Sequence, residues 1–270
     1  RKFRSLTTIR SYSPLSDEEI VRVAPSIFAR GKHQSRSMRY AYIPTSDVLK
    51  GLRNEGFQPF MGRQTGVRDE SRREHTKHMI RLRHATQITG KEANEIILLN
   101  SHDGSSSYQM LAGLVRFACQ NGMVCGENLN DIRIPHKGNI IHDVIEGAFT
   151  VLDDFGTINA QLDGMKALTL NPGEQAAFAH AALTLKYDDP DKPAPITEDQ
   201  LLSARRFDDR PNDMWTTLSR VQENMIKGGL QGRSQSGRRT TTRAVNGIDQ
   251  NVKINRELGV LAEKMRQLNS

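Results

Sequence analysis

The chain has 270 residues, with 38 Lys and Arg against 31 Asp and Glu, so its formal net charge is +7. Hydrophobic residues make up 36%, too many for a chain disordered throughout, and no apolar run approaches the roughly 20 residues of a membrane helix. The two cysteines form no paired metal motif, and Arg1–Arg10 holds no apolar signal-peptide core. We therefore expect a cytoplasmic protein in a reducing compartment, away from membranes.

The excess positive charge is concentrated in two segments. Residues 30–84 hold thirteen Lys and Arg against five acids, a net charge of +8. Residues 227–243 hold five Lys and Arg and no acid, a net charge of +5, which leaves −6 for the remainder. Basic segments on an acidic body indicate a polyanionic partner, although a solvated charged face is the simpler interpretation.

The first half of the chain predicts strands mixed with short helices. Ser16 and Glu19 have capping-box spacing, which predicts a helix that begins after Ser16. Aromatic, β-branched or alternating residues predict extended segments at Met38–Ile43, Phe57–Gln64, Lys77–His84, Glu95–Asn100 and Met123–Gly126. Helices are expected at Asp47–Asn54, capped by Thr45 or Ser46 and closed by Gly56, and at Tyr108–Cys119, where apolar residues recur at helical spacing.

The second half of the chain predicts helices alone. They are expected at Ile140–Phe155, Pro172–Tyr187, Thr197–Arg206, Asn212–Ile226 and Val252–Leu268. Tyr187–Pro195 has the composition of a linker, and Lys227–Asn246, rich in Gly and Arg, is expected to be mobile without a partner.

The order of these elements predicts an α+β fold, with an antiparallel, basic-faced sheet and a packed helix in the first half and a helical second half. Five segments are expected: an irregular or helical N-terminal segment (1–35), an α+β core (36–135), a helical region (136–226), a mobile Gly/Arg-rich segment (227–246) and a C-terminal helix (247–270).

The two basic segments supply the candidate nucleic-acid contacts. In Lys77–His84, strand alternation places Ile80 and Leu82 on one face and Arg81 and Arg83 on the other. The residues expected to contact phosphates are Arg63, Arg72, Arg73, Lys77, Arg81 and Arg83, with a second contact from Arg233, Arg238, Arg239 and Arg243. Aromatic side chains that either stack on bases or lie in the core are Tyr40, Tyr42, Phe57 and Phe60.

This assignment predicts that replacing Arg81 and Arg83 with Glu weakens binding more than replacing Arg205 and Arg206.

Motifs for catalysis are not evident. His75 and His78 do not predict a metal site, because a strand would point their side chains to opposite faces. Core positions are the simpler interpretation of Cys119 and Cys125. The stretch His102–Ser105 fits an Asx turn or an anion-binding loop better than a catalytic triad. We therefore expect no enzyme, no metal site and no cofactor.

Several stretches resemble the signature of the domain-of-unknown-function 932 family. They are Asn100–Gln109, Ala112–Phe117, Cys119–Val124, Glu223–Gly229, Gly237–Arg239, Arg243–Val245 and Gly247–Asn251. The resemblance runs from about Phe57 to Leu261 and implies a protein encoded on prophages or conjugative plasmids of enteric bacteria. It implies no established activity. The expected layout of strands and helices also resembles that of single-strand annealing proteins, which form oligomeric rings that hold single-stranded DNA in a basic groove.

Three hypotheses about function follow. The first is a nucleic-acid-binding protein of a mobile element that binds single-stranded DNA and promotes strand annealing and recombination as a homo-oligomer. The second is an interaction protein that modulates a host defence or repair factor. The third is a metal-dependent nuclease.

Overall fold

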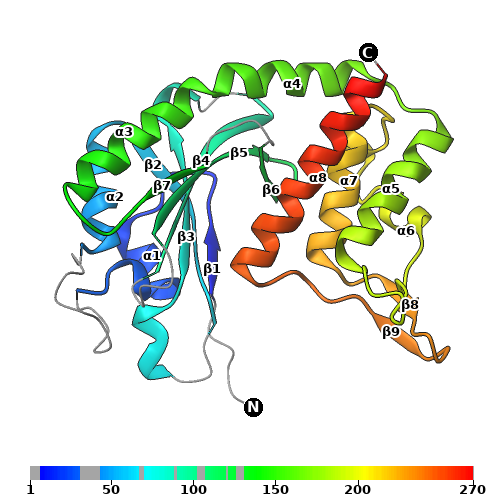
Figure 1. Ribbon diagram of the computed structural model, residues 1–270, viewed down its shortest axis with the longest axis horizontal. Coiled ribbons are helices and arrows are strands. Elements are labelled where there is room, and N and C mark those ends of the chain that lie inside the picture. The colour runs from blue at the N-terminus through cyan, green and yellow to red at the C-terminus, as the bar shows by residue number, and fades with distance from the viewer. Residues whose placement is uncertain are drawn as a thin grey trace. The chain divides into compact units, whose positions relative to one another are not determined.

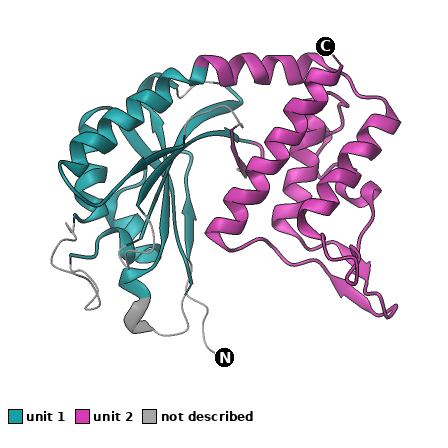
Figure 2. Cartoon of the chain, viewed as in Figure 1, with its two compact units in different colours: residues 1–117, 129–155 teal, residues 118–128, 156–270 magenta. Residues whose placement is uncertain are grey.

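A computed structural model describes most of the chain. The described residues are 7–30, 43–66, 70–87, 90–101, 107–119, 121–125 and 131–269. The chain divides into two compact units: unit 1 comprises residues 1–117 and 129–155, and unit 2 comprises residues 118–128 and 156–270 (Figure 2). The expected 227–246 and 247–270 segments both fall within unit 2, and the strand expected at Met38–Ile43 lies almost entirely outside the described residues.

Unit 1 is built on an antiparallel sheet (Figure 1). Its strands are β1 (Thr8–Arg10), β2 (Phe57–Gln64), β3 (His78–His84), β4 (Glu92–Asn100), β5 (Tyr108–Arg116) and β7 (Ile132–Ile134). Strands β1 to β5 are neighbours in chain order, and β7 pairs with the start of β5, where Tyr108 lies opposite Ile134. The connections from β2 to β5 are short, which favours this meander, whereas residues 11–56 separate β1 from β2. The predicted α+β class is confirmed.

The helix predicted at Tyr108–Cys119 is wrong, because Tyr108–Arg116 form strand β5 and a turn follows it. Met110 lies opposite Leu98 of β4, and Met110, Leu111 and Ala112 are all buried. A strand covered on both faces shows a nearly continuous apolar run, which fits helical spacing as well as it fits a strand. Periodicity alone therefore could not separate the two.

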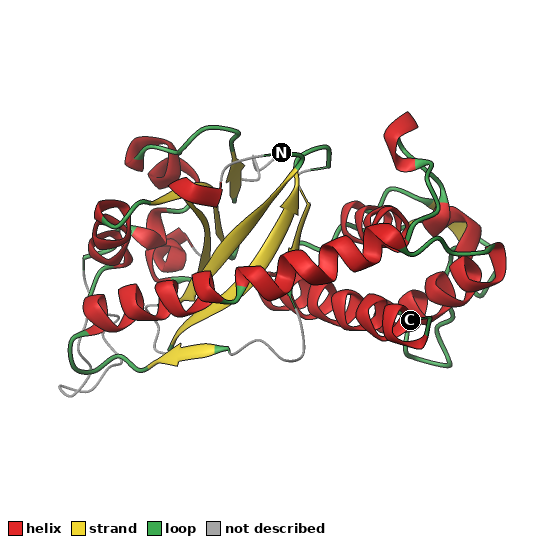
Figure 3. Ribbon diagram, turned by 90° about the horizontal axis from the view of Figure 1, so that it is seen from above, coloured by secondary structure: helices red, strands yellow, loops and turns green. Residues whose placement is uncertain are grey.

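Three helices belong to unit 1, and they lie on one side of its sheet (Figures 1 and 3): α1 (Asp17–Val23), α2 (Thr45–Asn54) and α3 (Ile140–Asp153). The predicted capping box is confirmed, since the Ser16 hydroxyl accepts from the Glu19 N–H and the Glu19 carboxylate accepts from the Ser16 N–H. The predicted cap of α2 is wrong: Pro44 precedes the helix, and Thr45 instead hydrogen-bonds to His78 and Asn100 of the sheet.

Unit 2 is mainly helical (Figure 2). Its elements are β6 (Asn121–Val124), α4 (Phe155–Ala167, of which Phe155 belongs to unit 1), α5 (Pro172–Lys186), α6 (Glu198–Leu202), α7 (Met214–Lys227), β8 (Gln231–Arg233), β9 (Arg239–Thr241) and α8 (Ile248–Leu268). The expected helix after Thr197 ends at Leu202, short of Arg206. Helix α7 contacts α5, α6 and α8, and every residue from Met214 to Ile226 is buried.

Short 3₁₀ helices connect several of these elements. They span Pro25–Ile27, Glu70–His75, Ala85–Gln87 and Phe207–Asp209. None of the helices in the described ranges has the length and apolarity that crossing a membrane requires.

Candidate nucleic-acid interface

The arginines of β3 do not form the exposed basic face that strand alternation predicts. Arg81 and Arg83 are each 5% exposed, and both donate to the carboxylate of Glu95, at 3.0 Å in each case. Glu95 lies on the neighbouring strand β4 and is 1% exposed. The alternation of side chains within β3 does not show that an acid on the neighbouring strand pairs with its arginines. The sequence therefore indicated a basic face in solvent, where the structure has a buried ion cluster.

Aromatic rings complete the surroundings of Arg83. Its guanidinium carbon lies 4.2 Å from the centre of the Phe60 ring and 5.0 Å from that of Phe117. Phe57 and Phe60 are both buried, so they belong to the core and are closed to a base. The other two candidates for stacking, Tyr40 and Tyr42, lie outside the described residues.

The remaining candidates of unit 1 are also largely enclosed. Arg63 is 6% exposed, and burial, with a smaller effect from the charge of Arg81, lowers the pKa of its guanidinium. Arg73 and Lys77 are half-buried, and Arg73 donates to the carbonyl of Arg22 at 3.4 Å. The side chain of Arg72 lies outside the description. The described part of unit 1 therefore does not bring these residues together on an open surface.

The second group of candidates lies on an ordered β-hairpin. We call residues 229–243 the basic hairpin, which contains β8 and β9. Where the composition predicts a mobile segment, the structure has two strands that pair antiparallel, with Arg233 directly opposite Arg239. Gly237, with φ of 76°, closes the turn by donating to the carbonyl of Ser234 at 2.8 Å.

The arginines of the basic hairpin are open to solvent. Arg233, Arg238, Arg239 and Arg243 are all exposed, and none of them forms an ion pair with any residue in the described ranges. Residues 228–247 contain no acid. Like charges directly opposite each other on paired strands destabilise the pairing, so this arrangement favours an anionic partner.

Backbone contacts hold the basic hairpin against the rest of unit 2. The Arg233 N–H donates to the carbonyl of Pro195 at 2.9 Å. Gly232 makes this approach possible, because a Cβ there would lie 2.0 Å from the same oxygen. The Gln200 side chain donates to the Gln231 carbonyl at 2.7 Å, and the Lys186 ammonium donates to the Arg243 carbonyl at 3.0 Å.

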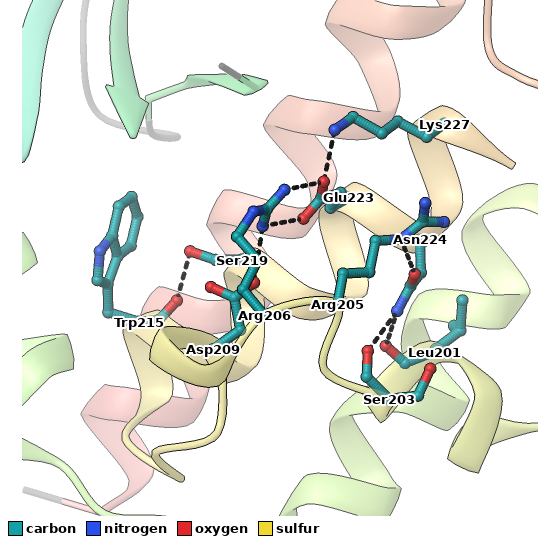
Figure 4. Close-up of polar contacts among 10 residues, drawn as sticks. All are labelled: Leu201, Ser203, Arg205, Arg206, Asp209, Trp215, Ser219, Glu223, Asn224 and Lys227. Atoms are coloured by element: carbon teal, nitrogen blue, oxygen red, sulfur yellow. Dashed lines mark hydrogen bonds and ion pairs between the residues drawn. The ribbon is translucent and has the colours of Figure 1, made fainter. Parts of the chain in front are cut away.

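A buried polar cluster lies at the end of α7 that leads into the hairpin (Figure 4). The Glu223 carboxylate, 3% exposed, accepts two hydrogen bonds from Arg206, at 2.5 and 2.8 Å, and one from Lys227 at 2.5 Å. Arg206 also donates to Asp209 at 2.7 Å. These contacts fix the 3₁₀ turn Phe207–Asp209 to the last turns of α7.

The charge state of this cluster follows from its partners. Burial, the largest effect, would raise the pKa of Glu223, but the hydrogen bonds and charges of Arg206 and Lys227 together outweigh it and lower the pKa. The same hydrogen bonds to Glu223 raise the pKa of Arg206. Glu223 is therefore ionised at neutral pH.

Asn224 joins the same helix to the segment before it (Figure 4). Its amide donates to the carbonyls of Leu201 and Ser203, at 2.8 and 3.0 Å, and its oxygen accepts from Arg205 at 2.7 Å. Arg205 also donates to the Gly228 carbonyl at 3.2 Å.

Arg205 and Arg206 are therefore structural, and they cannot serve as the neutral comparison that the sequence suggested for Arg81 and Arg83. The sequence reasoning missed this cluster, whose only signal was the resemblance of Glu223–Gly229 to a family signature.

Metal ligands do not converge in the described part of the chain: no group of three or more His, Cys, Asp or Glu there could hold an ion. Cys119 is buried and Cys125 is half-buried. The His102–Ser105 stretch lies outside the described residues.

Comparisons with known proteins identify relatives but no activity. Two proteins of Escherichia coli strain K12, UPF0380 protein YafZ and UPF0380 protein YfjQ, are each 55% identical to this chain over 264 residues, covering 98% of this chain and 96% of the relative. No solved structure matches. A family model matches residues 32–258. The chain belongs to the family described as Domain of unknown function (DUF932).

Proposed function

We propose that this protein binds nucleic acid through the basic hairpin, with single-stranded DNA as the favoured ligand. The observation that supports the proposal most strongly is the exposed pair Arg233 and Arg239, which lie opposite each other with no acid nearby in the sequence. A phosphate placed beside two guanidinium groups accepts hydrogen bonds from both and removes their mutual repulsion.

The hairpin is suited to this role because it is held in place before any ligand arrives. Contacts from Pro195, Gln200 and Lys186 fix its backbone, so binding does not have to pay for ordering the segment. The arginine side chains extend from this fixed support. Recognition of this kind contacts the backbone of the nucleic acid and is largely independent of sequence.

We also propose that the protein promotes annealing of complementary DNA strands as a homo-oligomer. Two complementary strands repel each other through their phosphates, and a surface that neutralises phosphates lowers that repulsion. Several copies of the basic hairpin in one assembly would hold two strands close together. The expected result is faster pairing of complementary oligonucleotides in the presence of the protein, together with particles larger than a monomer once single-stranded DNA is added.

The direct test measures fluorescence anisotropy of labelled single-stranded and duplex oligonucleotides at low and high salt. We expect binding at low salt that weakens steeply as salt rises, and tighter binding of the single strand. Absence of binding at low salt would overturn the proposal.

An acidic protein surface is the other ligand that exposed arginines suit. If the hairpin binds a host defence or repair protein instead, a stoichiometric complex would survive nuclease treatment and the oligonucleotides would not bind. We do not propose a metal-dependent nuclease, because no cluster of His, Cys, Asp or Glu among the described residues could hold the metal ion.

A further inference from the structure

Phe207 is an aromatic side chain that the fold leaves in water. It is 76% exposed and begins the 3₁₀ turn Phe207–Asp209, between α6 and α7 of unit 2. A single exposed apolar residue is common on protein surfaces and by itself indicates nothing. What distinguishes Phe207 is how firmly its backbone is held and which groups surround its ring.

The residues on both sides of Phe207 are fixed. Arg206, which precedes it, bonds to Asp209 and Glu223. The Arg210 N–H donates to the Phe207 carbonyl at 3.2 Å, and the carbonyl of Arg210 accepts from Arg220 at 3.4 Å. The backbone that carries the ring is therefore held by hydrogen bonds. A ligand that stacks on the ring does not have to order this turn, so little affinity is lost on that account.

The surroundings of the ring suit a nucleobase. The guanidinium carbon of Arg210 lies 5.0 Å from the ring centre, a cation–π arrangement. Bases of single strands stack on aromatic rings and on guanidinium planes alike. The charges within three residues of Phe207 almost balance, because Arg205, Arg206 and Arg210 stand against Asp208 and Asp209, a net charge of +1. This small charge favours an uncharged base at this position over a phosphate.

The ring lies within reach of the basic hairpin in the same unit. Arg205, two residues before Phe207, donates to the Gly228 carbonyl. Gly228 packs against the hairpin backbone, since a Cβ there would lie 2.7 Å from the carbonyl carbon of Arg243. Covalent lengths and these contacts together set an upper limit of roughly 25 Å on the distance between the Cα atoms of Phe207 and Arg243. At about 3.4 Å per stacked nucleotide this is some seven nucleotides, within the roughly 4–16 that single-strand-binding surfaces occupy.

We infer that Phe207 is the base-stacking position of the nucleic-acid surface, and that it gives the protein its preference for single strands. The inference rests on the proposed function, because the arginines of the hairpin supply the phosphate contacts. A duplex keeps its bases stacked on each other, so it gains nothing from the ring. A single strand offers an open base face to it.

Two variants test the inference. Phe207→Leu keeps an apolar side chain but removes the ring, and we expect it to weaken binding of single-stranded DNA at least about fivefold, the low end of base–aromatic stacking, while binding of duplex DNA stays unchanged. Phe207→Trp places an indole at the same position, and its fluorescence should be quenched when single-stranded DNA binds. The native Trp215 is 3% exposed and supplies a constant background.

Tyr12 provides the matched control, because it is another exposed aromatic, at 66%, and lies in unit 1. Tyr12→Leu should leave affinity unchanged and Tyr12→Trp should not be quenched. Wild-type binding together with an unaffected Phe207→Leu and an unquenched Phe207→Trp would overturn this inference and leave the proposed function standing. Absence of wild-type binding would overturn both.

Discussion

Arg206 and Glu223 form a two-point ion pair inside unit 2, with N–O distances of 2.5 and 2.8 Å. The pair joins the 3₁₀ turn that presents Phe207 to the end of α7 from which the basic hairpin begins. Both parts of the proposed nucleic-acid surface therefore depend on one buried carboxylate. Glu223 is therefore the first position to replace when the role of this ion pair is tested.

Glu223→Gln removes the charge that Arg206 and Lys227 share. We expect a loss of about 2 kcal/mol in the free energy of unfolding at pH 7, less than the roughly 3–5 of a fully buried pair, because the Arg206 side chain is 31% exposed and water screens it. Urea unfolding measures this loss. Glu257→Gln removes a carboxylate from a far more exposed pair with Lys253 and should change stability by less than about 0.5 kcal/mol. Equal losses in the two variants would contradict the structural role of Glu223.

The stabilisation from Glu223 depends on pH in a defined direction. Its pKa in the folded protein is lowered, so the folded state holds the carboxylate ionised more firmly than the unfolded chain does. The stabilisation is therefore complete above the ordinary pKa of about 4.5 and is lost as pH falls through the lowered value. The difference between wild type and Glu223→Gln should shrink as unfolding is measured at pH values further below 4.5. A difference that grew with acidity would contradict this direction.

Glu95→Gln tests the buried cluster of β3 and β4. The variant leaves Arg81 and Arg83 without their shared counter-charge, which we expect to cost about 3 kcal/mol, seen as a lower melting temperature. Molecules that remain folded should bind single-stranded DNA as wild type does, because neither arginine is open to a ligand. A folded Glu95→Gln variant with tighter DNA binding than wild type would contradict the enclosure of these arginines, because freed guanidinium groups would then contact phosphates.

Gly232→Ala and Gly237→Ala compare two glycines of the basic hairpin. A Cβ at Gly232 would lie 2.0 Å from the Pro195 carbonyl, so the hairpin has to move away from its support. A Cβ at Gly237 meets no atom within 4 Å and costs only the strain of a φ of 76°, about 1 kcal/mol. We expect a larger loss of DNA affinity from Gly232→Ala, with helix content by circular dichroism unchanged in both. The reverse order would contradict the anchoring of β8 on Pro195.

Local signals in the sequence predicted much of the secondary structure. The box of Ser16 and Glu19 predicted the start of α1, and Phe57–Gln64 was predicted with the bounds that β2 has. In β5, burial on both faces removes the alternation of apolar and polar residues, so the sequence predicted a helix where the structure has a strand. Local composition also predicted mobility at residues 227–246, because Gly and Arg dominate there. The contacts that order the hairpin come from Pro195 and Gln200, distant positions that composition cannot show.

The candidate site was predictable only in part. Runs of arginine were visible in the sequence, but whether an arginine binds a ligand or a buried acid depends on strand pairing. Glu95 forms ion pairs with both Arg81 and Arg83 because β4 places it beside them. Arg233 and Arg239 stay exposed because the strands that pair them carry no acid. The exposure of Phe207 likewise follows from the turn before α7, which the sequence presented as part of a helix region.

The salt dependence of DNA affinity in Arg238→Ala/Arg239→Ala is the sharpest test of binding through the basic hairpin. Arg22→Ala/Arg133→Ala is the matched control, since it removes the same charge from two exposed arginines of unit 1. For single-stranded DNA, log affinity falls linearly with log salt, and this dependence should become less steep by about 1.4 in the hairpin variant, or roughly 0.7 per lost phosphate contact. In the control it should keep the wild-type steepness. Equal slopes and affinities for the two variants would contradict binding through the basic hairpin.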